Sequence, residues 1–190
     1  MNARWAKTAI WWSVYPLGAC GAPIRTGDRP GPHHRLRLLE GWLDHIIALG
    51  CNGLALGPIW QSSSHGYDII DHLMIDPRLG DEADFDRLID HCHRRGIRVL
   101  LDGVFNHVSS QHAGVKQVQS QGWGCAAARL FRRDPNQADG LSRFEGHDSL
   151  VELDHSHPEV VDQVTRIMSY WLDRGADGWR LDAAYRVPTG

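Results

Sequence analysis

The sequence lacks the marks of several protein classes. None of its 190 residues lies in an apolar run near the roughly 20 residues that a membrane-spanning helix needs. The formal net charge is −3, so no excess of positive charge favours nucleic acid or an anionic membrane as a partner. The apolar segment that ends at Val14 is too short and too aromatic for a signal peptide. We therefore expect a cytoplasmic protein that binds neither nucleic acid nor membranes.

Cysteine is also scarce, and no two cysteines form a C-x-x-C pair. The sequence has four, at Cys20, Cys51, Cys92 and Cys125. In a protein without a secretion signal we expect reduced thiols, mostly buried among packing residues. The rest of the composition, 42% hydrophobic and 23% charged, is that of a globular domain with a sizeable core.

What the sequence does contain is an alternation of short apolar segments with amphipathic ones. The apolar segments predict strands, the amphipathic ones carry apolar residues at helical spacing, and a glycine follows each of these. The predicted strands are residues 10–15, 52–59, 97–105 and 178–184, and the predicted helices are residues 36–49, 81–95 and 158–174. This order is typical of a parallel sheet covered by helices, an α/β fold.

A long insertion interrupts the alternation after the third strand. Residues 108–153 are rich in Gly, Ser, Gln and Asp and exceed ordinary loop lengths, which predicts a small subdomain. We therefore divide the chain into three βα units at residues 1–107, the insertion, and a third helix and fourth strand at residues 154–190.

A complete eight-stranded barrel takes about 250 residues, so four strands predict an unfinished barrel. Its exposed edges favour self-association.

Two aspartates occupy unusual positions near the ends of predicted strands. Asp102 and Asp182 each follow apolar residues, and a carboxylate there costs desolvation unless it is paired or used. Arg180 precedes Asp182 by two residues and so shares its face of the strand. It can hold Asp182 ionised, as a carboxylate nucleophile requires. A structural Asp–Arg pair in the core is an equally open interpretation.

Further polar and aromatic residues are expected at the same rim. Asn106 and His107 end the strand of Asp102, and His65 and Tyr67 follow the second strand. A tyrosine ring can stack on a sugar, and a histidine can donate a hydrogen bond to a hydroxyl. Ordinary packing is the alternative for each residue taken singly, but their convergence on one rim favours a site.

Two histidine pairs invite a metal interpretation, which we do not favour. His91 and His93 lie two apart in a predicted helix, where side chains point in different directions. His155 and His157 precede Pro158, in a pattern that suits the start of a helix.

These segments resemble the signature sequences of the α-amylase family of glycoside hydrolases. Residues 102–107 (DGVFNH) resemble the first signature and residues 178–183 (GWRLDA) the second. Residues 65–72 (HGYDIIDH), followed by DPRLG at residues 76–80, resemble the segment after the second strand. The matches occur in the right order along nearly the whole chain. The resemblance implies the first four strands of a (β/α)8 TIM barrel, with a short insertion after strand 3.

The resemblance also implies the activity and the roles of individual residues. The family cleaves or transfers α-glucosidic bonds with retention, through a covalent intermediate. Asp182 matches the nucleophile and Arg180 its partner. Among the substrate-binding positions, Asp102 matches a residue that supports the hydrogen bonding of the site and His107 one that contacts the sugar. Tyr67 matches the stacking platform and His65 a neighbouring sugar contact.

The sequence departs from the family pattern in three places. No residue matches the acid/base Glu, which belongs after a later strand, so we expect this chain alone to be inactive. Tyr185 and Arg186 replace the Lys-His of starch-degrading members, and the short insertion also favours α-glucoside oligosaccharides as substrates. No cofactor is required. Asn106 matches a calcium position, but Glu152 stands where calcium-binding members carry Asp, so calcium stays an open possibility.

One other function is open to the same residues, and a second is set aside. A non-catalytic sugar-binding or assembly relative would keep the fold and lose the chemistry. A metal-dependent amidohydrolase barrel would need an H-x-H pair at the end of the first strand, and residues 11–16 contain no histidine.

Overall fold

The architecture was obtained as a computed structural model, which describes residues 4–25 and 32–187. Its centre is a sheet of four parallel strands in the order β1-β2-β5-β8. The strands are β1 (Trp11–Val14), β2 (Gly53–Leu56), β5 (Arg98–Gly103) and β8 (Gly178–Leu181). All neighbouring pairs are parallel, so the carboxyl ends of the four strands meet at one edge. The predicted parallel α/β sheet is confirmed, with each strand shorter than the apolar segment that contains it.

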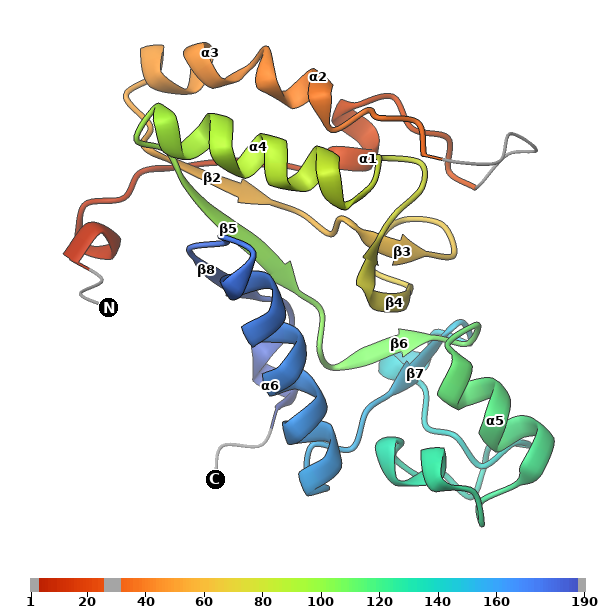
Figure 1. Cartoon of the computed structure of the whole chain (residues 1–190). Helices are drawn as coiled ribbons and strands as arrows, with labels where there is room; N and C mark the ends of the chain where they lie inside the picture. Colours follow the sequence, from red (N-terminus) through yellow and green to blue (C-terminus); the bar gives the residue numbers. More distant parts are fainter. Residues whose placement is uncertain (1–3, 26–31, 188–190) are drawn as a thin grey trace.

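Helices lie alongside this sheet (Figure 1). They are α1 (Pro16–Ala19), α2 (Arg37–Glu40), α3 (Leu43–Ala48), α4 (Glu82–Arg94) and α6 (Pro158–Asp173). The helix α4 begins at Asp81, whose carboxylate accepts the backbone N–H of Asp84 in a reciprocal capping box. Its buried face is Phe85, Leu88, Ile89 and Cys92, as the spacing predicts. None of the described helices combines the length and the apolarity that crossing a membrane requires.

The prediction of a single helix at residues 36–49 is wrong. The segment forms two short helices, α2 and α3, separated at Gly41 and Trp42. Glycine is a poor helix former, and here the indole of Trp42 stacks on Trp12 at 6.0 Å between ring centroids. Ile47 in α3 is 46% exposed.

A hairpin that the sequence pattern does not predict follows β2. Strands β3 (Trp60–Ser62) and β4 (Ile69–Ile75) pair antiparallel, with an irregular register. Beneath the connecting loop, fully buried Arg78 forms an ion pair with Asp76 at 2.6 Å. Its Nη1 also donates to the backbone oxygens of Ser64 and Ile24. This network fixes the loop that carries His65 and Tyr67.

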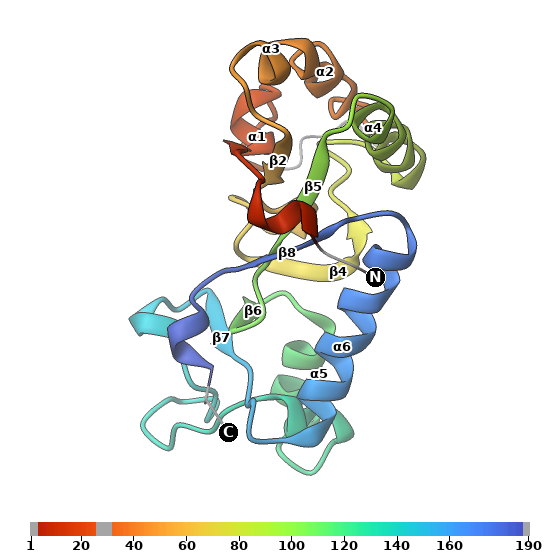
Figure 2. The same ribbon diagram turned by 90° about the vertical axis from the view of Figure 1, so that its left-hand side faces the viewer.

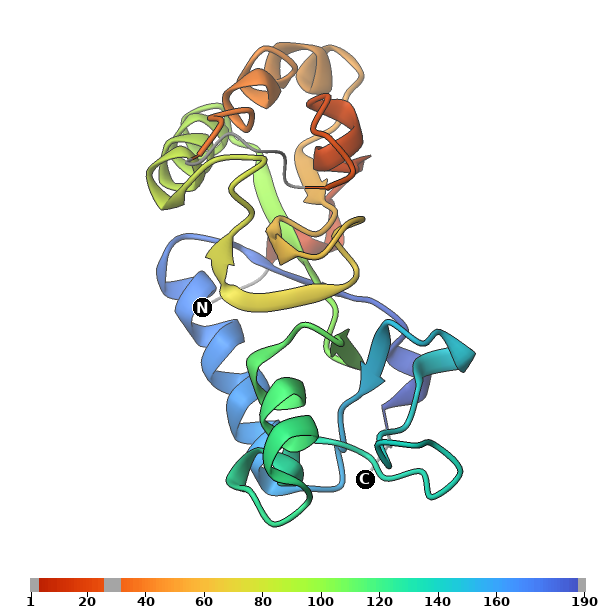
Figure 3. The same cartoon turned by 90° about the vertical axis from the view of Figure 1, so that its right-hand side faces the viewer.

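The insertion forms a second, smaller unit with its own apolar cluster. It contains β6 (His107–Ser109), α5 (Ala113–Gln121) and β7 (Leu150–Glu152), with 3-10 turns at Ala126–Leu130 and Phe144–Gly146. Strands β6 and β7 pair antiparallel directly after the end of β5. In the two turned views the insertion makes up the lower part of the molecule, at the end of the sheet towards which β5 runs (Figures 2 and 3).

The helix α6 joins the two units. Its Val160 packs in the cluster of the insertion, whereas Ile167 and Trp171 pack in the main core. Two apolar residues of α6 do not lie in the core: Val161 is 50% exposed and Leu172 39%. Val161 is exposed because it lines an open apolar cavity of about 390 Å³ between α6 and the end of β8.

Candidate functional site

The centre of the candidate site is a guanidinium group between two carboxylates at the ends of adjacent strands. Arg180 Nη1 lies 2.5 Å from Asp102 Oδ1 and 3.3 Å from Asp182 Oδ1. The shorter contact is the one across the strands, because Asp102 and Arg180 are register partners in the β5–β8 pair. Arg180 therefore forms ion pairs with both Asp102 and Asp182. The spacing in the sequence suggested a partner for Asp182 alone.

The carboxylate of Asp102 is almost completely buried. It accepts hydrogen bonds from Arg180 and, at 3.3 Å, from the Tyr67 hydroxyl, while Trp60 Nε1 donates to its backbone oxygen. Burial raises the pKa of Asp102 above its ordinary value, although Arg180 acts in the opposite direction. Burial, followed by the charge of Asp102, raises the pKa of Tyr67 to about 12, so this hydroxyl stays protonated and donates.

Asp182 is more accessible, and its backbone is held from both sides. Its N–H donates to the carbonyl of Gly103 at 3.0 Å, and its own carbonyl accepts from Asn106 Nδ2 at 2.6 Å. The next residue, Ala183, has φ of 45° and ψ of 38°, a left-handed conformation that is costly for a residue with a Cβ atom. Strain of this kind is often found at functional sites. The result is a partly exposed carboxylate on a firmly anchored backbone.

His107 lies beside this centre with one ring nitrogen free. Its Nε2 contacts the backbone oxygen of Tyr67 at 3.1 Å, and its ring packs on Phe144 at 4.2 Å between centroids. Burial lowers the pKa of His107, which favours the neutral ring. Its Nδ1 is buried without a hydrogen-bond partner, and such an atom favours a ligand that supplies one.

His65 is the most peripheral of the predicted site residues. Its ring centroid lies 6.3 Å from that of Tyr67, and its Nδ1 accepts the Tyr67 N–H at 3.3 Å. Its backbone oxygen accepts a hydrogen bond from Tyr15 at 2.9 Å. The imidazole is half exposed. The structure thus places Tyr67, Asp102, His107, Arg180 and Asp182 in one connected group and His65 at its margin.

The residues around Asn106 fit a calcium ion only in part. Asn106 Oδ1 is a buried oxygen without a hydrogen-bond partner, and it is of the kind that calcium prefers. Glu152 stands where calcium-binding members of the family carry Asp, and both of its carboxylate oxygens already accept hydrogen bonds. Its Oε1 accepts from Arg186 at 2.7 Å and its Oε2 from Ser142 at 2.6 Å. Since a positive side chain occupies this carboxylate, the donor set does not suit calcium.

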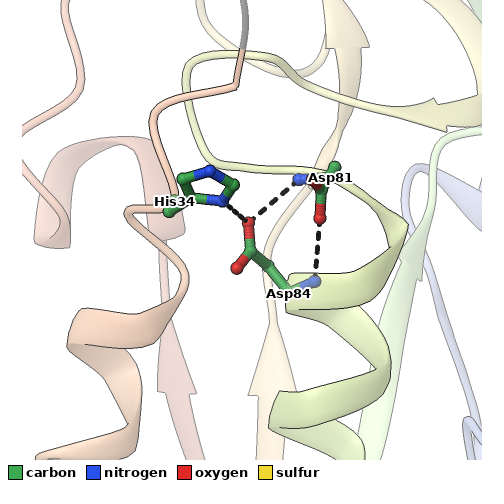
Figure 4. A group of neighbouring side chains, drawn as sticks. All are labelled: His34, Asp81 and Asp84. Atoms are coloured by element: carbon green, nitrogen blue, oxygen red, sulfur yellow. Dashed lines mark hydrogen bonds and ion pairs between the residues drawn. The ribbon is translucent and has the colours of Figure 1, made fainter.

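A second group of potential metal ligands lies far from this site, at the start of α4. His34, Asp81 and Asp84 point toward one another there (Figure 4). Asp84 accepts from His34 Nδ1 and from Arg37 Nε, each at 2.6 Å. The cluster is therefore a helix cap reinforced by cations, which leaves no free carboxylate for a metal ion.

The histidines of the two pairs each contact another residue of the chain. His91 contacts Glu40 and His93 contacts Asp177, each at 2.8 Å, so the two rings point in different directions. His157 accepts the N–H of Glu159 as the N-cap of α6. All four cysteines are free, but only two of them, Cys20 and Cys92, are buried.

Some residues at the site have no signal in the sequence. Phe144 comes from the 3-10 turn late in the insertion and reaches His107, and Trp60 comes from the unpredicted hairpin. Their positions depend on how the insertion and the hairpin fold back over the strand ends. Arg186 and Glu152 each stand out in the sequence, but their pairing does not, because they lie 34 residues apart in the chain.

Comparison with known proteins gives a family match and similar relatives from that family. The family described as alpha amylase, catalytic domain, matches residues 38–189. Neopullulanase 2 of Thermoactinomyces vulgaris is 34% identical, over 97% of this chain and 35% of its own length. The intracellular maltogenic amylase of Bacillus subtilis (strain 168) is 36% identical, over 97% of this chain and 34% of its own length. This chain spans about a third of the length of these curated relatives.

A solved structure shares the architecture described above. It is the cyclic alpha-maltosyl-(1→6)-maltose hydrolase from Arthrobacter globiformis, in complex with maltose. The TM-score is 0.83 at 30% identity, and the alignment covers 97% of this chain and 46% of that one.

Proposed function

Because the chain belongs to the alpha-amylase family, we propose that it carries the nucleophile half of a site that cleaves or transfers α-glucosidic bonds in oligosaccharides. The four parallel strands are then the first four of a (β/α)8 barrel, with residues 108–153 inserted after the third barrel strand, β5. The names of two relatives support short α-glucosides as the substrate class. One is a maltogenic amylase, and the other is a cyclic alpha-maltosyl-(1→6)-maltose hydrolase in complex with maltose.

In the proposed reaction, a carboxylate oxygen of Asp182 attacks the anomeric carbon of the sugar. A bond forms between them while the bond to the leaving oxygen breaks, and a carboxylic acid about 5 Å away protonates that oxygen. Water or another sugar hydroxyl then attacks the same carbon and gives its proton to the carboxylate that the acid has become, and Asp182 leaves as a carboxylate, so the configuration is retained. The acid is not among the residues of this chain that match the family.

The observation that carries this proposal is the position of Arg180 between Asp102 and Asp182. The guanidinium of Arg180 lies 3.3 Å from Asp182 Oδ1 and can hold this carboxylate in a fixed orientation, as a nucleophile requires. Asp102 anchors the guanidinium from the buried side and is itself held by Tyr67. The more exposed carboxylate is thus left to attack.

The surrounding residues are proposed to hold the sugar. The Tyr67 ring offers an apolar face for stacking, and His65 at the margin is placed for a neighbouring sugar unit. The free Nδ1 of His107 is the group we assign to a sugar hydroxyl. No cofactor takes part in this scheme.

Binding to matched disaccharides tests the proposal. We expect maltose, which has an α-linkage, to perturb NMR signals of residues around Tyr67 and His107, and cellobiose, which has a β-linkage, to leave them unchanged. Equal responses to the two sugars, or none to maltose, would contradict an α-glucoside site here.

The second candidate is a sugar-binding relative without catalysis. The observations that favour it are the Tyr67 ring and the free Nδ1 of His107, which can hold a sugar without any catalysis. It predicts the same binding of maltose but no covalent bond to Asp182, so a test for that bond separates the two candidates.

We further propose a cytoplasmic location and self-association. Strands β1 and β8 are the two edges of the sheet, and Ile10 and Leu181 beside them are more than half exposed. Exposed edges of this kind favour pairing between copies. Size-exclusion chromatography with light scattering is expected to show dimers or larger species, and a monomer at all concentrations would contradict this.

A further inference from the structure

The segment that follows Asp182 is tied to the insertion by two polar contacts. The Tyr185 hydroxyl donates to Glu145 Oε1 at 2.6 Å, and Arg186 Nη2 donates to Glu152 Oε1 at 2.7 Å. The first contact is exposed to solvent, and pairs of this kind contribute little to stability. The second is different, because the carboxylate of Glu152 is only 7% exposed.

Glu152 lies where the insertion meets the site. It is the register partner of His107 in the β6–β7 pair, and the neighbouring Leu153 donates its N–H to the carbonyl of Asn106. Its buried carboxylate needs a positive neighbour, since an unpaired buried charge is costly. Arg186 provides one at 2.7 Å, and Arg132 lies further away, at 3.8 Å.

The guanidinium of Arg186 also reaches the ring that supports the site. It lies 5.8 Å from the centroid of Phe144, and the Phe144 ring packs on His107. Arg186, which belongs to the segment after Asp182, therefore reaches both Glu152 in strand β7 and the Phe144 ring that packs on His107.

We propose that Arg186 is a built-in cation that neutralises Glu152 in place of a bound metal ion and fastens the segment after Asp182 to the insertion. A calcium ion needs six to eight oxygen ligands. Here Asn106 Oδ1 remains available, but both oxygens of Glu152 are engaged by Ser142 and Arg186. The proposal concerns stability and metal dependence, so it does not rest on the cleavage of any glycoside.

Thermal unfolding of the chain in excess EDTA and over a calcium titration tests the proposal. The unmodified chain is expected to have the same Tm in both conditions. Arg186→Met is expected to lower the Tm by about 3 °C or more. The Tm of this variant should then rise saturably with calcium, because the carboxylate of Glu152 and the oxygen of Asn106 become available to the ion.

Two further variants serve as controls. Arg186→Lys keeps a positive charge and is expected to recover most of the lost Tm without a calcium response. Arg94→Met removes an exposed ion pair of similar length, Arg94–Asp90 at 2.8 Å, and should change the Tm by less than Arg186→Met.

Three results would overturn the proposal. The first is a saturable rise of Tm with calcium in the unmodified chain. The second is a Tm of Arg186→Met no lower than that of Arg94→Met. The third is a loss of stability in Arg186→Met with no response to calcium. If Arg186→Met does not fold, calorimetric titration of the unmodified chain with calcium decides instead: no binding supports the proposal, and binding refutes it.

Discussion

Asp102 and Arg180 are direct neighbours across the β5–β8 strand pair, and their side chains meet with Arg180 Nη1 2.5 Å from Asp102 Oδ1. The same nitrogen lies 3.3 Å from Asp182 Oδ1. One buried carboxylate thus fixes the cation that serves a second, more exposed carboxylate. Under the proposed function, the buried Asp102 positions Arg180 and the more exposed Asp182 is the carboxylate that attacks.

The first prediction concerns stability. Arg180→Met removes the cation from buried Asp102, and leaving a buried charged group without its partner costs about 1–3 kcal/mol of unfolding free energy. Urea unfolding measures this, with Arg94→Met as the matched exposed control. An Arg180→Met chain as stable as the control would show that the ion pair does not hold the site together.

The second prediction separates the ring of Tyr67 from its hydroxyl. Tyr67→Phe keeps the stacking face and loses only a 3.3 Å hydrogen bond to Asp102, so the Kd for maltose should change by less than about threefold. Tyr67→Ala removes the face and should weaken binding about tenfold. Equal Kd values for the two variants would contradict the stacking role.

The third prediction concerns pH and a histidine outside the site. Burial lowers the pKa of His72 from 6.5 to about 4, and the ring contacts the backbone oxygen of Val104 at 2.9 Å. Between these pH values the unfolded chain binds a proton that the folded chain excludes. Stability from this residue is therefore full above pH 6.5 and is lost as the pH falls toward 4, by about 3 kcal/mol.

Comparison with a variant isolates this contribution. His72→Gln retains a side-chain donor for Val104 but does not titrate, so its unfolding free energy should fall less between pH 6.5 and pH 4 than that of the unmodified chain. His147→Gln, at an exposed position, should behave like the unmodified chain. Identical pH profiles for His72→Gln and the unmodified chain would contradict the assignment.

The fourth prediction concerns turnover by the 190-residue chain itself. Protonation of the leaving group contributes about 10²–10⁴ in rate, and no residue here is assigned to supply the proton. Maltose, whose leaving sugar oxygen needs a proton, should therefore not be cleaved to glucose at a steady rate. Steady release of glucose that disappears in Asp182→Asn would mean that an acid is present after all.

Much of the fold follows from the sequence because its signals are local. Helical spacing of apolar residues, the stop at Gly96, and Asp81 at the start of α4 all act within a few residues of one another. The convergence of Asp102 and Asp182 was also predictable, since the carboxyl ends of parallel strands meet at one edge of the sheet.

The remaining features depend on contacts between distant segments. The β3–β4 hairpin rests on Arg78, which reaches back to Ile24 and Ser64. The choice of Asp102 as the closer partner of Arg180 follows from the register of two strands, and no pattern within either strand encodes it. Likewise, the pairing of Arg186 with Glu152 requires the fold of the whole insertion.

The most direct measurement is a test for a covalent bond between a sugar and Asp182. A fluorinated α-glucosyl fluoride carries a leaving group that departs without an acid, so it probes attack by the nucleophile alone. The chain is incubated with this reagent, and peptide mass spectrometry locates the adduct. We predict one glucosyl adduct, on Asp182, and none in Asp182→Asn. An adduct on another residue, or none under conditions in which maltose binds, would contradict the assignment of Asp182 as the nucleophile.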